Sequence, residues 1–263
     1  MMSRGDVVAF RGAGFSPRDR PWAAVATLLV LIGFWQAGSS FGLIPDLFLP
    51  SPAGIVRALI SLSISGELWA HLSASLLRLA VGWTAGTVAG IALGVGVGLF
   101  TPLRSPGMAV VSALFPIPKI ALVPLFIIWF GIGEGSKFAT IGFGVFFPTV
   151  IGTAGAVDNL SRSLIRMGQS FGLSRWAIVR KIVLPGALPA ILSNMRITAA
   201  IAIVLLVAAE MIGARRGIGA FVLAEGNLYD MDGLLAGIVV LSVLGLVVSW
   251  GISRVERALL GWR

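Results

Sequence analysis

The stretch 159–190, NLSRSLIRMGQSFGLSRWAIVRKIVLPGALPA, is the one long polar interruption in a chain that otherwise consists of apolar segments. After Asp158 it contains no acidic residue, and its five cationic residues are Arg162, Arg166, Arg175, Arg180 and Lys181. Basic segments between membrane spans concentrate on the cytoplasmic side of the membrane. We therefore predict that this stretch lies on the cytoplasmic face.

The same stretch has the order helix, glycine, helix, proline. Apolar residues at three- and four-residue steps predict a first short helix, and they are Leu160, Leu164, Met167 and Phe171. Gly172 is placed to end this helix in a left-handed conformation. Ser174 is placed to cap a second helix that carries Trp176 on its apolar side. Pro185 is expected to end the second helix, because proline has no N–H to donate.

The composition identifies the class of protein. Hydrophobic residues make up 57% of the 263 residues and charged residues only 12%, which is too little polar surface for a soluble domain of this size. The composition thus predicts an all-α integral membrane protein. The net charge of +9 is spread along the chain near the ends of apolar segments, so we expect no nucleic-acid partner. With no cysteine and one histidine, the chain is not expected to bind a metal.

Six apolar segments predict six transmembrane helices, at residues 22–38, 73–100, 105–133, 137–157, 188–212 and 234–253. The expected organisation is a cytoplasmic arm at 1–21, a transmembrane domain at 22–255 that includes a cytoplasmic loop at 158–187, and a cytoplasmic tail at 256–263. The proposed inner segments hold thirteen Lys and Arg residues and the outer ones hold four. This asymmetry predicts that both termini are cytoplasmic.

The second span and the segment before it carry the next signals. Five glycines at four-residue steps predict close helix packing along one face, and they are Gly82, Gly86, Gly90, Gly94 and Gly98. Arg78, inside the span, either reaches back to the membrane interface or pairs internally. His71, beside Trp69, is either interfacial, which we favour, or a proton or ligand site.

The third span is broken by Pro116, Pro118 and Pro124. Such breaks are tolerated at membrane depth where the freed carbonyls face protein or a water-filled cavity, so we place the translocation path beside this segment. Lys119 lies within it, and it either contacts a ligand, extends into an aqueous vestibule or pairs with a helix carbonyl. Two polar residues of the fifth span are further candidates for the path, namely Asn194 and Glu210.

The spacing within the cytoplasmic stretch resembles a family signature. Gly172, nine residues, Ile182, one residue, Leu184 and Pro185 look like the tail of the signature of ATP-binding-cassette (ABC) importer permeases, whose head is Glu-Ala-Ala. Here Arg166, Met167 and Gly168 stand at that head. The resemblance implies that the second short helix docks on an ATPase subunit and couples hydrolysis to transport. The residues expected to serve this coupling are Arg166, Gly168, Gly172, Ser174, Arg175, Trp176, Arg180, Ile182, Leu184 and Pro185.

Four stretches between about residues 48 and 255 extend the resemblance to permeases of nitrate, sulfonate and taurine importers. They are GELWAHLSASLLRLAVGW, PIPKIALVPLFIIWFGIGEGSKF, FGLSRWAIVRKIVLPGALPAILSNMRI and AAEMIGARRGIGAF. The resemblance implies a six-helix type I ABC importer permease bundle, similar to MetI, with a cytoplasmic coupling helix, in a bacterial inner membrane. The implied partners are a second copy of the chain, two ATPase subunits that hold ATP-Mg, a periplasmic or lipid-anchored solute-binding protein, and membrane lipid. No cofactor is expected on this chain, which contains no G-x-x-x-x-G-K-[ST] loop.

The cations near the predicted path, Lys119 with Arg78 and Arg196, favour an anionic solute such as a sulfonate, taurine or nitrate. A neutral or aromatic solute (a pyrimidine, a riboflavin-like compound or an aromatic acid) is the alternative. An ion-coupled carrier is disfavoured because the two halves show no convincing inverted repeat. An intramembrane enzyme is disfavoured because no convergent catalytic side chains occur within the spans.

Overall fold

The computed structural model describes residues 21–261, and every regular element in this part of the chain is helical. Five described helices are long and apolar enough to cross a membrane, and a pair of helical segments bent by 86° is either a sixth, broken span or a re-entrant loop. The predicted all-α membrane fold is confirmed, and the five or six apolar spans are consistent with the predicted six. The elements are α1 (Pro21–Ser40), α2 (Pro52–Ser65), α3 (Glu67–Leu99), α4 (Thr101–Leu114), the 3₁₀ turn η1 (Lys119–Leu122), α5 (Val123–Phe130), α6 (Glu134–Asp158), α7 (Arg162–Ser170), α8 (Arg175–Ile178), the π-helical turn η2 (Val179–Val183), α9 (Leu184–Gly213), α10 (Ile218–Leu228) and α11 (Met231–Leu259).

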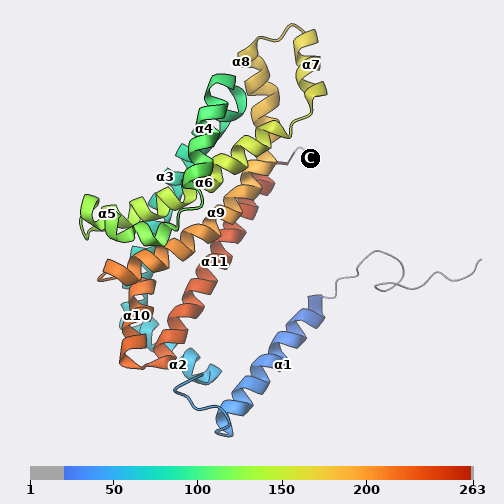
Figure 1. Ribbon diagram of the computed structural model, residues 1–263. Coiled ribbons are helices and arrows are strands. Elements are labelled where there is room, and N and C mark those ends of the chain that lie inside the picture. Colours follow the sequence, from blue (N-terminus) through green and yellow to red (C-terminus); the bar gives the residue numbers. More distant parts are fainter. Residues whose placement is uncertain (1–20, 262–263) are drawn as a thin grey trace, which may run out of the picture.

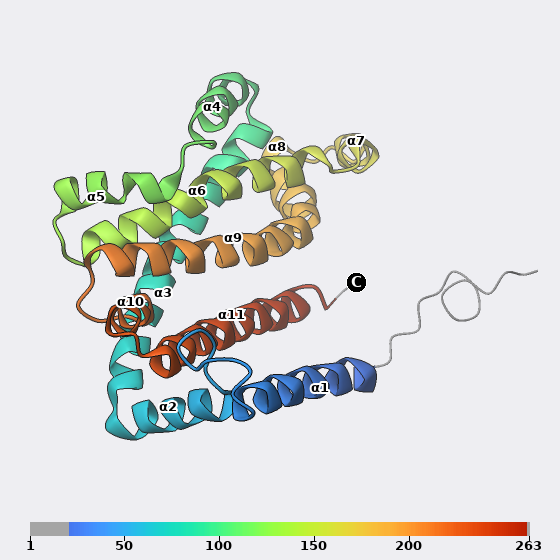
Figure 2. The same ribbon diagram turned by 60° about the horizontal axis from the view of Figure 1, so that its bottom comes forward.

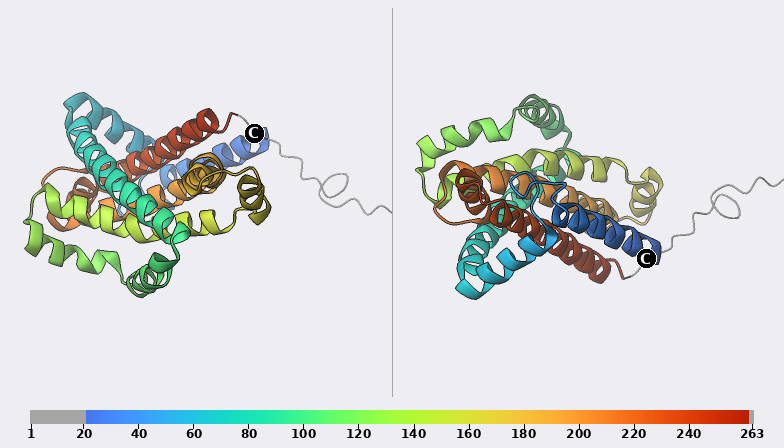
Figure 3. Two further views of the ribbon diagram at one scale, coloured as in Figure 1. Left: turned by 90° about the horizontal axis from the view of Figure 1, so that it is seen from above. Right: turned by 90° about the horizontal axis from the view of Figure 1, so that it is seen from below.

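The helices run between two ends of the molecule (Figures 1 and 2). One end, here called the α7 end, holds α7, α8, the last turn of α11 and the first turn of α1. The opposite end, the α10 end, holds α10 and the α5–α6, α9–α10 and α2–α3 turns. Viewed along the vertical axis of Figure 1, α3 crosses the other long helices (Figure 3). In the view of Figure 1, α1 lies apart from the other long helices. None of the most apolar part of α1 is buried, so this helix exposes an apolar surface.

The boundaries differ from the predicted ones where local chemistry extends a helix. Gly66, with φ 86°, separates α2 from α3, so the second span begins at Glu67 rather than at residue 73. The last helix continues into the predicted tail as far as Leu259, and Glu256 within it pairs with Arg196 of α9 at 2.7 Å. Of the predicted N-terminal arm, residues 1–20 lie outside the described part, and Pro21 already belongs to α1.

The predicted close packing of the glycine face is confirmed, because the glycines of α3 lie directly against α6. A Cβ atom on Gly86 would stand 2.3 Å from the carbonyl oxygen of Gly142, and one on Gly90 would stand 2.6 Å from the Cβ of Thr149. Side chains other than hydrogen would push the two helices apart. The α3–α6 pair therefore forms the tightly packed centre of the bundle.

Substitution of Gly86 by Ala should strongly destabilise this helix pair. The added methyl group meets a backbone atom that cannot rotate away, so we expect a loss at the upper end of the roughly 1–3 kcal/mol typical of overpacking. Gly96→Ala in the same helix is the matched control, because its Cβ would meet only a Leu103 methyl group, at 3.9 Å. Thermal unfolding in detergent should show a lower midpoint for Gly86→Ala alone. Equal midpoints for the two variants would contradict the packing described here.

Candidate functional site

The polar stretch forms a helical tip that projects from the α7 end (Figure 1). Gly172 follows α7 with φ 70°, which confirms the predicted left-handed glycine. The hydroxyl of Ser174 accepts a hydrogen bond from the N–H of Ala177 at 3.2 Å, which confirms the predicted cap of the second helix. These two local signals, a stop and a start, shape the tip into a helix, a sharp turn and a second helix.

The prediction that Pro185 ends the second helix is wrong. The chain is helical from Arg175 to Gly213 without a gap, and Pro185 lies in the first turn of α9. The π-helical turn η2 makes this possible, because the N–H of Leu184 bonds to the carbonyl of Val179, five residues back. Proline is compatible with the first turn of a helix, where its missing N–H is not needed. A helical segment without a gap thus joins the tip to the span α9.

The two faces of the tip have different chemistry. Ile178 and Val183 are buried against the body of the molecule. Gly168 is buried within the tip against Ile178 and Ile182. The opposite face, here called the tip surface, exposes four apolar side chains that are 43–78% accessible, namely Leu164, Met167, Phe171 and Trp176. The apolar face predicted for the first helix therefore points outward except at Leu160. Of the other predicted coupling residues, Ile182 is half-buried and five are exposed, namely Arg166, Arg175, Arg180, Leu184 and Pro185.

A second feature is a cavity of about 320 Å³ beside the broken span, here called the central cavity. It is lined by Phe115, Ile117, Pro118, Lys119, Ile120, Gly144, Pro148, Ile201 and Leu205. The helix α4 ends just before Pro116 and Pro118, and the bend of 86° follows. Lys119 donates to the carbonyls of Leu114 and Phe115, which the end of α4 leaves without helical partners. This is the helix-carbonyl pairing considered from the sequence.

Aromatic rings complete the surroundings of the ammonium group. Its nitrogen lies 5.1 Å from the centroid of the Phe115 ring and 5.4 Å from that of Phe147. Pro148 interrupts α6 and removes the N–H that would pair with the carbonyl of Gly144, which also lines the cavity. Sequence reasoning overlooked Pro148, although a proline inside an apolar span was a visible signal. The central cavity is therefore mainly apolar, with one cation at its wall.

The predicted path residues are only partly brought together. Pro118 and Lys119 line the central cavity, whereas Pro116 and Pro124 do not. Asn194 lies near the cavity wall and donates to the carbonyl of Pro148 at 3.3 Å. Glu210 does not face the central cavity, and its place in the fold is different from the predicted one.

Glu210 is fully buried where α3, α9 and α10 meet. Its carboxylate accepts hydrogen bonds from Ser75 at 2.8 and 3.0 Å, from Arg78 at 2.8 Å and from the N–H of Gly219 at 2.8 Å. Arg78, only 3% exposed, also binds Glu134 through two bonds of 2.6 and 2.7 Å. Of the two alternatives for Arg78, internal pairing is the one observed. We call Arg78, Glu210 and Glu134 with Ser75 the Arg78 cluster.

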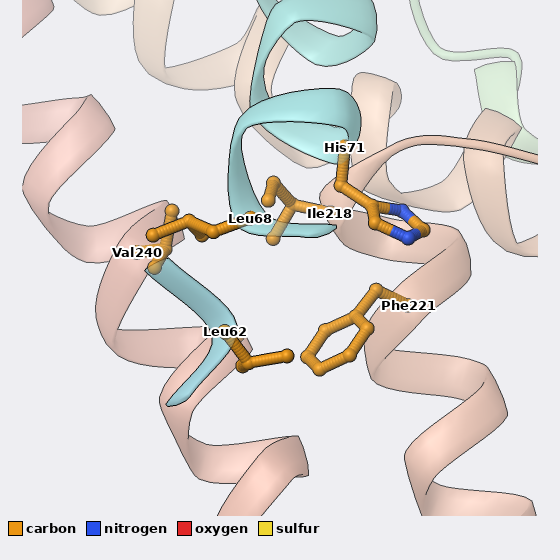
Figure 4. A pocket seen from close by; sticks show the side chains of 7 residues that line it. Leu62, Leu68, His71, Ile218, Phe221 and Val240 are labelled. Carbon is orange, nitrogen blue, oxygen red and sulfur yellow. The ribbon is translucent and has the colours of Figure 1, made fainter. Parts of the chain in front are cut away.

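His71 lies next to this cluster and contacts the turn between α9 and α10. Its Nδ1 lies 3.1 Å from the nitrogen and 2.9 Å from the oxygen of Gly217, in the α9–α10 turn. Its ring faces that of Phe221, with 5.4 Å between centroids, at a closed apolar cavity of about 10 Å³ (Figure 4). A void of that size admits about one water molecule. His71 therefore holds a turn in place, and the small cavity beside it is no solute site.

Comparison with known proteins identifies the family. Residues 86–261 match the family described as "Binding-protein-dependent transport system inner membrane component". The chain belongs to this family. The permease is 35% identical to the taurine transport system permease TauC of Escherichia coli, over 91% of this chain and 89% of TauC. It is 37% identical to the aliphatic sulfonates transport permease SsuC of the same organism over 88% of each chain. The riboflavin transport system permease RibX of Chloroflexus aurantiacus is 34% identical over 94% and 95% of the two chains.

A solved structure of the MetNI methionine ABC transporter in an inward-facing conformation has the same fold. Its matching chain superposes with a TM-score of 0.63 at 23% identity, over 74% of this chain and 95% of that chain. The expected MetI-like bundle and the resemblance to taurine and sulfonate permeases are thereby confirmed. The chain is accordingly a membrane permease of an ABC importer and not an enzyme.

Proposed function

We propose that this permease forms the translocation path for a small anionic solute of the sulfonate, taurine or nitrate type, in an ATP-driven importer supplied by a solute-binding protein. The observation that carries the choice of an anion is Lys119, a cation at the wall of the apolar central cavity. An ammonium group beside an apolar wall attracts anions more strongly than one surrounded by water. The similarity to TauC and SsuC supports the same class of solute.

The continuous helix from Arg175 to Gly213 supplies the mechanism. At one end it carries Trp176 on the tip surface, and further along Ile201 and Leu205 line the central cavity with Lys119. A helix without a gap connects a displacement at the tip to the wall of this cavity. When ATP binding closes a pair of ATPase subunits against the tip, the wall of the central cavity moves with it. The path then switches between inward-open and outward-open states.

The basic tip supports the orientation that we propose for the permease in a bacterial inner membrane. The α7 end is cytoplasmic, and there the tip surface contacts one of two ATPase subunits that bind ATP-Mg. Both termini belong to the same side, because α1 begins and α11 ends at the α7 end. The α10 end receives the binding protein. A second copy of the chain completes the path as a homodimer, and this chain itself needs no cofactor or metal.

A neutral aromatic solute is the second candidate. The rings of Phe115 and Phe147 beside Lys119 offer stacking surfaces, and RibX is named for riboflavin. Aromatic walls and one ammonium group suit a flat solute as well as a small anion. The two candidates differ in whether binding requires the charge of Lys119.

Stimulation of ATP hydrolysis distinguishes the candidates. The complete transporter is reconstituted in lipid with its binding protein, and hydrolysis is measured with taurine, ethanesulfonate, nitrate or riboflavin. We expect a sulfonate to raise hydrolysis severalfold over the rate without solute. If riboflavin stimulates and the anions do not, the proposed substrate class is wrong while the importer assignment stands.

Substitution of Lys119 by Gln should abolish most anion uptake. Gln retains an N–H donor for the carbonyls at the end of α4 but has no charge, so it separates a capping role from an electrostatic one. We expect uptake of the stimulating sulfonate to fall at least about tenfold, since removing one charge-assisted hydrogen bond costs about 1.5–3 kcal/mol. Lys119→Arg, the matched control, should retain substantial uptake. If Lys119→Gln transports normally, Lys119 is only a helix cap.

A further inference from the structure

A polar cavity lies at the α10 end, separate from the central cavity. It has a volume of about 630 Å³ and lies between α3, the α5–α6 turn and the α9–α10 turn. Its lining is rich in cations and consists of Ala74, Arg78, Ile132, Gly133, Glu134, Lys137, Gly213, Arg215 and Arg216. We call it the α10-end cavity.

Arg215 and Arg216 are exposed at its rim on a fixed turn. Within residues 21–261 neither guanidinium group makes an ion pair or a side-chain hydrogen bond. The backbone beneath them is held in place, since the carbonyl of Arg216 accepts from Arg78 at 2.5 Å and the next residue, Gly217, contacts His71. Two fork-shaped donors thus line one cavity from a stretch of backbone that is held in place.

Lys137 adds a third cation from the floor of the cavity. Its side chain is 4% exposed, and the ammonium donates to the carbonyls of Ile132 at 2.9 Å and Gly133 at 3.0 Å. An ammonium group has three N–H donors, so in the described part of the chain one donor is left over. A buried charge that is only partly satisfied is costly, and an anion in the cavity would offset that cost.

The carboxylates around the cavity do not cancel this charge. Glu134 lines the cavity, but both of its oxygens are engaged by Arg78, and Glu210 lies behind Arg78, fully buried. Four cations (Arg78, Lys137, Arg215 and Arg216) stand against these two carboxylates, which leaves a net charge of +2. The cavity therefore concentrates anions rather than cations.

We propose that the α10-end cavity binds a small oxyanion, with Arg215 and Arg216 gripping its oxygens and Lys137 beneath them. Planar guanidinium groups match the geometry of sulfonate and phosphate oxygens, and they bind such groups in pairs. The choice of a sulfonate as the occupant rests on the proposed function. The site then binds the sulfonate before it enters the central cavity. The same chemistry would hold the phosphate of an anionic lipid headgroup, so the experiment below separates the two sources.

The test measures binding directly and does not depend on transport. The full-length permease is placed in nanodiscs of phosphatidylcholine, and the ¹⁹F resonance of trifluoromethanesulfonate is recorded as protein is added. We expect line broadening with the wild type and at least about a tenfold weaker affinity for the double variant Arg215→Gln, Arg216→Gln. Arg57→Gln is the control, since Arg57 is an exposed arginine at the same end but outside this cavity. Replacing both arginines by Lys keeps the charge and should give an intermediate affinity.

Each outcome supports or overturns a separate part of the proposal. Broadening that is lost only in the Arg215 and Arg216 double variant supports the site. If phosphatidylglycerol in the nanodisc then abolishes the broadening, the occupant is a lipid phosphate, and if it has no effect, the occupant is a soluble oxyanion. Equal broadening for the wild type and the double Gln variant overturns the site. Binding without any sulfonate-stimulated hydrolysis by the complete transporter would instead reject the proposed solute and leave the site standing.

Discussion

Replacement of Glu210 by Leu is expected to destabilise the permease by about 1.5–3 kcal/mol or more, because the buried Arg78 loses one of its two carboxylate partners and keeps only Glu134. Arg78 is 3% exposed and Glu210 is fully buried, so water cannot compensate either charge. The change also removes the acceptor for Ser75 and for the N–H of Gly219. The expected result is a large fall in the thermal unfolding midpoint in detergent.

A double-mutant cycle distinguishes the lost pair from simple cavity formation. Arg78→Met together with Glu210→Leu removes both buried charges, and we expect the double variant to be more stable than Glu210→Leu alone. Arg104→Ala is the surface control, since its pair with Asp158 is just as short, at 2.6 Å, but about half exposed. Its midpoint should be almost unchanged. Additive losses in the cycle would show that the pair itself contributes nothing.

Substitution of Trp176 by Asp should prevent stable assembly with the ATPase subunits. Trp176 is 71% exposed on the tip surface and has no other large role in the fold. A tryptophan at the centre of an interface typically contributes about 2 kcal/mol or more, which corresponds to at least about a thirtyfold weaker complex. The measurement is the fraction of ATPase subunit that co-purifies with tagged permease, together with its dissociation constant in nanodiscs.

Leu228→Asp is the matched control for Trp176→Asp. Leu228 is a comparably exposed apolar residue, 73% accessible, but it lies in α10 at the opposite end of the molecule. It should leave ATPase binding unchanged, and both variants should retain the wild-type unfolding midpoint. A Trp176→Asp permease that binds and couples its ATPase normally would remove the tip surface from the mechanism.

Features governed by local chemistry could be predicted from the sequence. The left-handed Gly172, the capping Ser174 and the glycine face of α3 each depend on residues a few positions away. The break of the third span was likewise visible, because the prolines act on their own turn of helix. These signals were enough to define the bundle and the tip.

Features that depend on distant contacts could not be predicted. The partner of Arg78 lies 132 residues away in the sequence, so Glu210 looked like a path residue until the fold brought the two together. Periodicity predicts that α7 has an apolar face. It does not predict whether that face packs against the body of the molecule or points outward, because this depends on the other helices. Pro185 was wrongly expected to end the helix. In the π-helical turn before it, the N–H of Leu184 bonds to the carbonyl of Val179, so the chain remains helical up to the proline.

The most direct test of the account is the energy source of transport. The complete transporter is reconstituted in proteoliposomes with the binding protein on the side of the α10 end, and uptake of a labelled sulfonate is followed. We predict accumulation only when ATP is present on the side of the α7 end, and none from a proton or sodium gradient alone. Accumulation driven by an ion gradient without ATP would contradict the assignment of this chain as an ABC importer permease.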